Sequence, residues 1–246
     1  MRVALCLHGV VGHAYTNKAA HEWHDDVDYR IGLEHYRRNL FASNGGVDVF
    51  MHCWSTDYEE NLVRDYRPKG HRFERQIQFG HETVALNFLE SRWYSTHEAV
   101  RLKRTYERAM GFEYDWVVLS RFDLALLRSL DLRQSDPSDF WAGQHVLLPH
   151  AADDPVPADN VNNGFCDMIF YSGSKNINRF SELHRKWREY GLFHAHAEAY
   201  AHTQACGFRV RHGLTKGEDF ELVRYIYRDC HFKRQAYLGA DALQRR

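Results

Sequence analysis

The residues best suited to chemistry follow one strongly apolar run. Residues 114–120 read YDWVVLS, and Arg121 and Asp123 come directly after them. Such a run predicts a buried strand, and ligands of open α/β sheets bind at the carboxyl ends of strands. A carboxylate there can hold a hard divalent cation against a diphosphate, and an arginine can bind the diphosphate directly. The alternative is that Arg121 and Asp123 form a structural ion pair at a strand end.

The elements before this run predict a parallel sheet. Residues 2–8 (RVALCLH) are a short apolar run ending at Gly9, and residues 47–54 (VDVFMHCW) are a second. Between them, residues 31–43 carry apolar side chains at helical spacing, and glycines at 45 and 46 end the helix. Strand, helix and strand in this order make a βαβ unit, whose strands are parallel.

Helices dominate the segment before the apolar run at 114–120. We predict one helix over 81–92 and a second over 95–110, with Ser95 as its N-cap, Glu98 at the capping-box position and Gly111 as its stop. Residues 58–80 are charged and give no clear element, and residues 121–127 are expected to continue the strand.

The remaining chain alternates between apolar strands and helices. It predicts strands over 145–148, 164–171 and 208–211, and helices over 175–190, 193–206 and 218–229. The fold class is therefore α/β, with a mostly parallel sheet flanked by helices. Neither an internal repeat nor a linker is visible, so we expect a single domain over 1–246.

Composition narrows the class of protein. The net charge is −1, which argues against a nucleic-acid partner, and the five scattered cysteines favour reduced thiols. The amino-terminal apolar run is too short and too soon interrupted for a signal peptide, and no segment reaches the ~18–20 apolar residues that span a bilayer. We expect a cytoplasmic protein that touches a membrane, if at all, peripherally through its substrate.

The stretch YDWVVLSRFD resembles the strand that carries the DxD motif of GT-A glycosyltransferases, with Arg121 in place of the first Asp. Similar patterns occur in bacterial and viral surface-polysaccharide transferases. The strands RVALCLH and VDVFMHCW and the later segment NNGFCDMIFYSGSKNINRF agree with that family in order. The resemblance implies a Rossmann-like GT-A domain, with a nucleotide-binding half over about 1–127 and an acceptor half over about 128–246.

The same resemblance implies a function in polysaccharide biosynthesis. The enzyme would be a hexosyl- or related transferase that moves a sugar from a nucleotide-diphosphate donor to a glycan or lipid-linked acceptor, assisted by Mn²⁺ or Mg²⁺. Asp123 would bind the metal, and His212 matches the late histidine of the family. The base that takes the acceptor proton would be Asp167, a charge inside the apolar run GFCDMIF, or secondarily Glu198.

The nucleotide is expected near the end of the first strand. His8, Gly9 and Gly12 follow that strand, and a glycine turn lets the backbone approach a ligand closely. Asp57 can reach a ribose hydroxyl, and Arg121 can bind the diphosphate. Neither G-x-G-x-x-G nor a P-loop is present.

Two other classes of function stay open. One is a non-catalytic α/β module that binds nucleotide or glycan, and the other is a metal-dependent phosphohydrolase, which would need several Asp or His ligands at strand ends. His194, Glu198 and His202 recur every four residues along one helix face, a spacing that can bind zinc. Without an H-E-x-x-H arrangement, we interpret this face as a solvated polar stripe.

Overall fold

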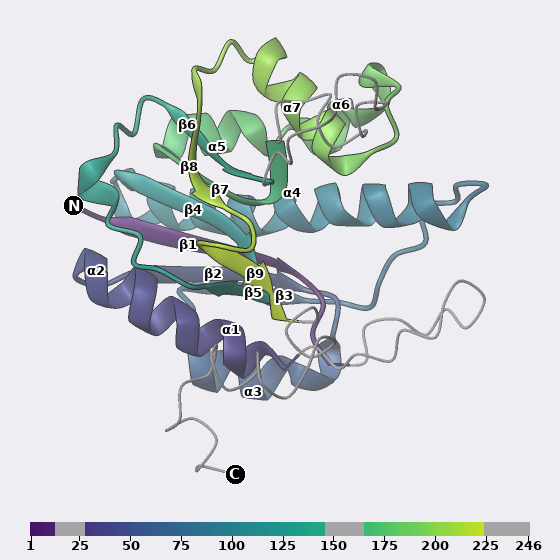
Figure 1. Ribbon diagram of the computed structural model, residues 1–246. Coiled ribbons are helices and arrows are strands. Elements are labelled where there is room, and N and C mark those ends of the chain that lie inside the picture. The colour runs from purple at the N-terminus through teal and green to yellow at the C-terminus, as the bar shows by residue number, and fades with distance from the viewer. Residues whose placement is uncertain (13–27, 146–164, 224–246) are drawn as a thin grey trace.

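The computed structural model describes residues 1–12, 28–145 and 165–223, and a seven-stranded sheet lies at its centre (Figure 1). The strand order is β3-β2-β1-β4-β7-β6-β8. β7 runs antiparallel to both neighbours, and the other pairs of this sheet are parallel. The strands are β1 (Val3–Gly9), β2 (Asp48–Cys53), β3 (Gly70–Phe73), β4 (Trp116–Arg121), β6 (Phe140–Gln144), β7 (Phe165–Ser172) and β8 (Val210–Thr215).

Helices cover both faces of the sheet (Figure 1). One face carries α1 (Tyr29–Tyr36), its continuation through a π-helical turn (Arg37–Phe41) into α2 (Ala42–Asn44), and α3 (Glu59–Tyr66). The other carries α4 (Val84–Met110), α5 (Ser174–Phe180), α6 (Leu183–Tyr190) and α7 (Ala195–Ala205). The predicted α/β class, a mostly parallel sheet between helices, is confirmed.

Burial on both faces explains why the central strands read as continuous apolar runs. Along β1, Leu5 and Leu7 pack into the core under α1 and α3, whereas Ala4 and Cys6 pack into the core under α4. Parallel strands covered on both faces need apolar residues at every position. No helix within the described ranges is long and apolar enough to cross a membrane. The single-domain organisation over 1–246 stays a prediction.

The helix stops at Gly45 and Gly111 are confirmed, since both glycines adopt left-handed backbone angles, with φ of 73° and 71°. The predicted helix start at Ser95 is wrong. Residues 84–110 form one helix, capped by the Thr83 hydroxyl, which accepts from the Leu86 N–H at 3.3 Å. The Ser95 hydroxyl is instead buried in mid-helix and accepts from the backbone N–H of Gly9 at 3.0 Å. A tertiary partner thus replaces the local one that capping requires.

In the second half of the chain one predicted element is wrong and others differ in their bounds. Residues 220–222 form the strand β9 of a second, two-stranded sheet with β5 (Leu124–Leu126), where we predicted a helix over 218–229. Phe220 and Leu222 are buried and Glu221 is not, which is the alternation of a strand. The helix predicted over 175–190 is interrupted between α5 and α6. The strand predicted over 208–211 is β8, which ends later, at Thr215. The strand predicted to begin at residue 145 is preceded by β6, which ends at Gln144. Residues 146–148 and 224–229 lie outside the described ranges.

Two elements, α3 and β3, have no local signal in the sequence. α3 and β3 lie within the charged stretch 58–80. β3 is at the edge of the sheet, and none of its four side chains is buried, so no apolar run marks it. The strand after Arg121 also differs from expectation, because a turn at residues 122–123 ends β4 and redirects the chain into β5. That turn places Asp123 at the carboxyl end of β4.

Candidate functional site

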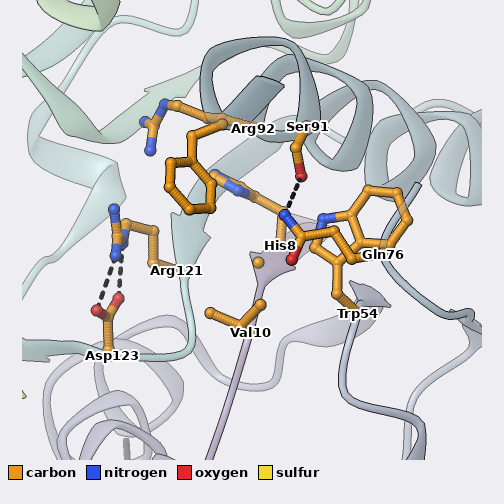
Figure 2. Close-up of a pocket in the computed structure, with 10 residues that line it drawn as sticks. His8, Val10, Trp54, Gln76, Ser91, Arg92, Arg121 and Asp123 are labelled. Atoms are coloured by element: carbon orange, nitrogen blue, oxygen red, sulfur yellow. Dashed lines mark hydrogen bonds and ion pairs between the residues drawn. The ribbon is translucent and has the colours of Figure 1, made fainter. Parts of the chain in front are cut away.

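A cleft of about 90 Å³ opens at the carboxyl ends of β1 and β4, beside the first half of α4 (Figure 2). On one side of β1 lie β2 and β3, and on its other side lies β4. The order of strands therefore reverses between β1 and β4. Ligands of open α/β sheets bind at such a switch point. The cleft is lined by His8, Gly9, Val10, Trp54, Gln76, Phe88, Ser91, Arg92, Arg121 and Asp123.

Arg121 and Asp123 face the cleft as a bidentate ion pair (Figure 2). Nε of Arg121 donates to Oδ1 of Asp123 at 2.6 Å, and Nη2 donates to Oδ2 at 2.8 Å. The backbone carbonyl of Asp123 accepts from the N–H of Val223 at 2.7 Å, which ties the turn to the end of β9. The carboxylate is buried, so it holds the guanidinium plane at the edge of the cleft.

Arg92 is a second cleft arginine, and our sequence analysis missed it because no motif marks it. It lies on α4, and its guanidinium points to the same space as that of Arg121 (Figure 2). Nε lies 2.9 Å from Oδ2 of Asp167, and Nη2 donates to the Asp167 carbonyl. Burial, and then the charge of Arg121, lower the pKa of Arg92, while the Asp167 charge opposes them.

Two of the residues predicted to bind the nucleotide, His8 and Gly9, line the cleft. The His8 ring is not a cation there. Burial, with the charges of Arg92 and Arg121, lowers its pKa well below 6.5, so the ring is neutral at pH 7. Gly9 has φ of 117° and Gly12 has φ of 68°, both in the region that favours glycine. Gly12 packs against the Tyr58 ring and is not among the cleft residues.

Asp57 and His212 also lie outside the cleft lining. Asp57 is exposed on the short 3₁₀ helix Thr56–Tyr58, after β2. His212 lies on β8, paired with Ala142 of β6, three strands away from β4. Neighbouring strands are ~4.8 Å apart, so β8 lies roughly 14 Å from β4. The structure therefore does not bring His212 and Asp123 together, and the ligand role of His212 stays a prediction.

Asp167 lies behind Arg92 and is held from both sides. Oδ2 contacts Arg92, and Oδ1 lies 2.8 Å from Nδ1 of His196 on α7. Burial alone would raise the pKa of Asp167, but these two partners hold it well below its usual range. A carboxylate so stabilised is a weak proton acceptor. Its predicted role as base stays untested, and the geometry gives it a clear role in positioning Arg92.

Glu198 is buried beneath α4, away from the cleft lining. Oε2 accepts from the indole N–H of Trp93 at 2.9 Å, while Oε1 has no hydrogen-bond partner in the described ranges. Burial raises the pKa of Glu198 to about 7, with the Trp93 hydrogen bond opposing. His202 on the same helix face is also buried, its Nδ1 lying 2.7 Å from the Tyr190 hydroxyl. The interpretation of this face as a solvated stripe is therefore wrong for Glu198 and His202, whereas His194 at the start of the helix is exposed.

Replacing Glu198 by glutamine is expected to stabilise the protein at alkaline pH. The folded-state pKa lies above the ordinary 4.5, so the stability contributed by this carboxyl is fully present below about 4.5 and is lost as pH rises through about 7. A pKa of about 7 in place of the ordinary 4.5 corresponds to about 3 kcal/mol at high pH. Urea unfolding of both proteins should give equal stability near pH 4.5 and a more stable variant at pH 8. A difference that does not change with pH would contradict the assignment.

The cleft combines positive charge with aromatic surface. Arg92 and Arg121 supply donors, and Trp54 and Phe88 line the same cleft, with Phe88 part-exposed. The Trp54 ring stacks on Tyr94 at 5.4 Å between centroids, which fixes its plane. Guanidinium groups bind phosphate oxygens in pairs, and flat apolar rings accept bases or sugar faces. The arrangement suits an anion that carries a planar or ring-shaped group.

No known protein family and no curated protein matches this sequence. Among solved structures, the fold is similar to that of a nucleoside-diphosphate-sugar pyrophosphorylase from Vibrio cholerae RC9, with a TM-score of 0.50. The match covers 96% of this chain and 99% of that chain, at 12% sequence identity. At so low an identity the likeness is one of fold: a mixed α/β domain with a mostly parallel, helix-flanked sheet.

Proposed function

We propose that this protein is a glycosyltransferase that takes its sugar from a nucleotide-diphosphate donor. The observation that carries the proposal is the pair of arginines, Arg92 and Arg121, at the switch point between β1 and β4. The resemblance of residues 114–123 to the DxD strand of GT-A enzymes supports the same site, and the fold likeness to an enzyme named for nucleoside-diphosphate sugars agrees with it.

In this proposal the two arginines bind the donor diphosphate. When the bond between the sugar carbon and the diphosphate oxygen breaks, negative charge builds up on the leaving diphosphate. Fixed cationic donors aimed at that charge stabilise the transition state. Asp123 holds the guanidinium of Arg121 in place, and Trp54 and Phe88 contact the base or the sugar. The acceptor hydroxyl attacks the sugar carbon and loses its proton, for which Asp167 and Glu198 remain the predicted bases.

A divalent metal fits the described cleft poorly. Asp123 is the one carboxylate among the lining residues, and both of its oxygens already bind Arg121. Mn²⁺ and Mg²⁺ prefer several oxygen ligands. We therefore propose that arginine charge, and not a metal, neutralises the diphosphate. The acceptor half over about 128–246 and a glycan or lipid-linked acceptor remain part of the proposal.

Product analysis tests this function. The protein of residues 1–246 is incubated with UDP-, GDP-, CDP- and ADP-sugars, each with EDTA or with Mn²⁺, and the released nucleotide is measured. We expect one nucleotide class to yield nucleoside diphosphate and free or transferred sugar, with turnover that persists in EDTA. Thermal stabilisation by the same nucleoside diphosphate, about 2.7 kcal/mol at 100 times its Kd, identifies the base.

The other outcomes separate the rival functions. Formation of nucleoside triphosphate and sugar phosphate when pyrophosphate is added would identify nucleotidyl transfer instead. Hydrolysis of simple phosphomonoesters would identify a phosphohydrolase, and stabilisation by nucleotide without any turnover would identify a binding module. Each of these results would overturn glycosyl transfer. Turnover that is lost in EDTA would keep the function and refute the metal-free mechanism.

A further inference from the structure

Three potential metal ligands from separate elements converge at one point beyond the cleft. His145 directly follows β6, Cys166 is the second residue of β7, and His196 is the second residue of α7. Their ligand atoms all lie within 4.8 Å of one another, and the two Nε2 atoms are 3.4 Å apart. Within residues 1–12, 28–145 and 165–223, no other three His, Cys, Asp or Glu side chains bring their ligand atoms so close together.

The separations match a tetrahedral metal. With metal–nitrogen bonds of about 2.0–2.1 Å, two nitrogens at tetrahedral positions lie ~3.3 Å apart, close to the observed distance between the two histidines. A nitrogen and a sulfur in the same geometry lie ~3.6 Å apart, so the observed separations exceed the ideal one by roughly 1.2 Å at most. The Cys166 side chain is fully buried, and the two histidines are half-buried around it.

The second nitrogen of His196 is oriented as in known metal sites. Nδ1 lies 2.8 Å from Oδ1 of Asp167 and 3.0 Å from the backbone nitrogen of the same residue. One ring nitrogen cannot accept from that N–H and also donate to the carboxylate. In the metal-free structure the Asp167 N–H donates to Nδ1; a metal bound at Nε2 would leave the ring proton on Nδ1, where the Asp167 carboxylate at 2.8 Å can accept it. Metal-bound histidines almost always donate their other N–H to such a partner.

We propose that His145, Cys166 and His196 form a site for Zn²⁺ or a similar divalent transition metal, separate from the cleft. One thiolate and two imidazoles suit zinc, whereas Mg²⁺ and Mn²⁺ prefer oxygen ligands. Three protein ligands leave one tetrahedral position for water or a further ligand. Binding releases the thiol proton and fixes the line of contacts that runs from His196 through Asp167 to Arg92.

Cobalt substitution tests the site in the tag-free protein of residues 1–246. Metal-free, reduced protein is titrated with Co²⁺, which reports a bound thiolate by a charge-transfer band and tetrahedral geometry by visible bands. We expect saturation at one equivalent and loss of both signals on addition of Zn²⁺. Cys166→Ser should abolish the charge-transfer band, and His145→Ala, His196→Ala and Asp167→Asn should weaken binding at least about 10-fold.

Cys206→Ser is the matched control, because its sulfur also lies near a histidine, 3.7 Å from Nε2 of His202. This variant should bind Co²⁺ like the wild type. If Cys166→Ser does not fold, X-ray absorption of the wild-type zinc protein decides the question, with one sulfur expected at about 2.3 Å and nitrogens at about 2.0–2.1 Å. A charge-transfer band that survives Cys166→Ser, one that is lost in Cys206→Ser, or a zinc shell without sulfur would overturn the proposal.

Discussion

Replacing Arg121 by glutamine is expected to lower nucleotide-sugar turnover by about 100- to 1000-fold. The Arg121 guanidinium is a mostly buried cation that lines the cleft at the carboxyl end of β4. Removing one preorganised hydrogen-bond donor that stabilises charge developing in the transition state typically costs that much. The effect should fall mainly on kcat, because the leaving diphosphate carries more charge in the transition state than in the bound donor. Steady-state kinetics with the donor identified by product analysis measures both constants.

The same substitution leaves the buried Asp123 without its partner, so stability must be separated from chemistry. Arg121→Gln/Asp123→Asn removes both charges and should restore most of the stability while turnover stays low. Asp131→Asn is the matched control, since Asp131 and Arg133 form an equally bidentate pair that is more exposed and is not among the lining residues. If the double variant regains full turnover, the pair is structural only and Arg121 takes no part in catalysis.

The sequence predicted those parts of the fold that apolar burial dictates. β1, β2, β4 and β7 are buried on both faces, so their side chains form continuous apolar runs. Helix ends at Gly45 and Gly111 were equally visible, because only glycine adopts a left-handed angle there at no cost. Local signals of this kind depend only on residues that are close together in the sequence. They also fixed Arg121 and Asp123 at the end of a strand.

Features that depend on partners distant in sequence were not predictable. Ser95 has the residue type of an N-cap, yet its hydroxyl is used by Gly9, 86 residues earlier. Arg92 looks like any surface arginine on a helix until Asp167, 75 residues later, pairs with it. Glu198 and His202 are polar residues on a helix whose burial only the packing of α7 against the sheet and α6 reveals. Periodicity in one helix cannot show which face another element will cover.

The cleft and the His145–Cys166–His196 group show the same limit. His145 and His196 are 51 residues apart and belong to no short motif, so nothing local links them. They meet because β7 reverses direction between β4 and β6 and because α7 packs against β7. A strand order that places late elements beside β4 is a property of the whole chain. Sequence spacing could therefore suggest a site at the end of β4, but it could not show which residues from other elements lie beside that site.

Replacing Lys103 by methionine is expected to destabilise the fold by about 3–5 kcal/mol, the usual cost of breaking a buried ion pair. Lys103 is fully buried on α4, and its Nζ lies 2.8 Å from Oε2 of Glu107 and also donates to Ser174. Glu107 in turn accepts from the N–H of Tyr114 at 2.9 Å, just before β4. Without the lysine, a buried carboxylate keeps its hydrogen bonds but loses its counter-charge. Urea unfolding followed by circular dichroism measures the loss.

Two further variants show whether the cost lies in the unpaired charge. Lys103→Met/Glu107→Gln removes both charges and should recover to within about 1–2 kcal/mol of the wild type, because neutral groups of similar volume often replace a buried pair at little cost. Lys175→Met removes an exposed lysine that lies 3.7 Å from Glu113 and should change stability by less than about 0.5 kcal/mol. The Lys103 network lies at the amino end of β4, opposite the cleft, so the double variant should bind nucleotide with wild-type affinity. If it folds normally but binds more weakly, the two ends of β4 are coupled and the separation of stability from function drawn from this geometry is wrong.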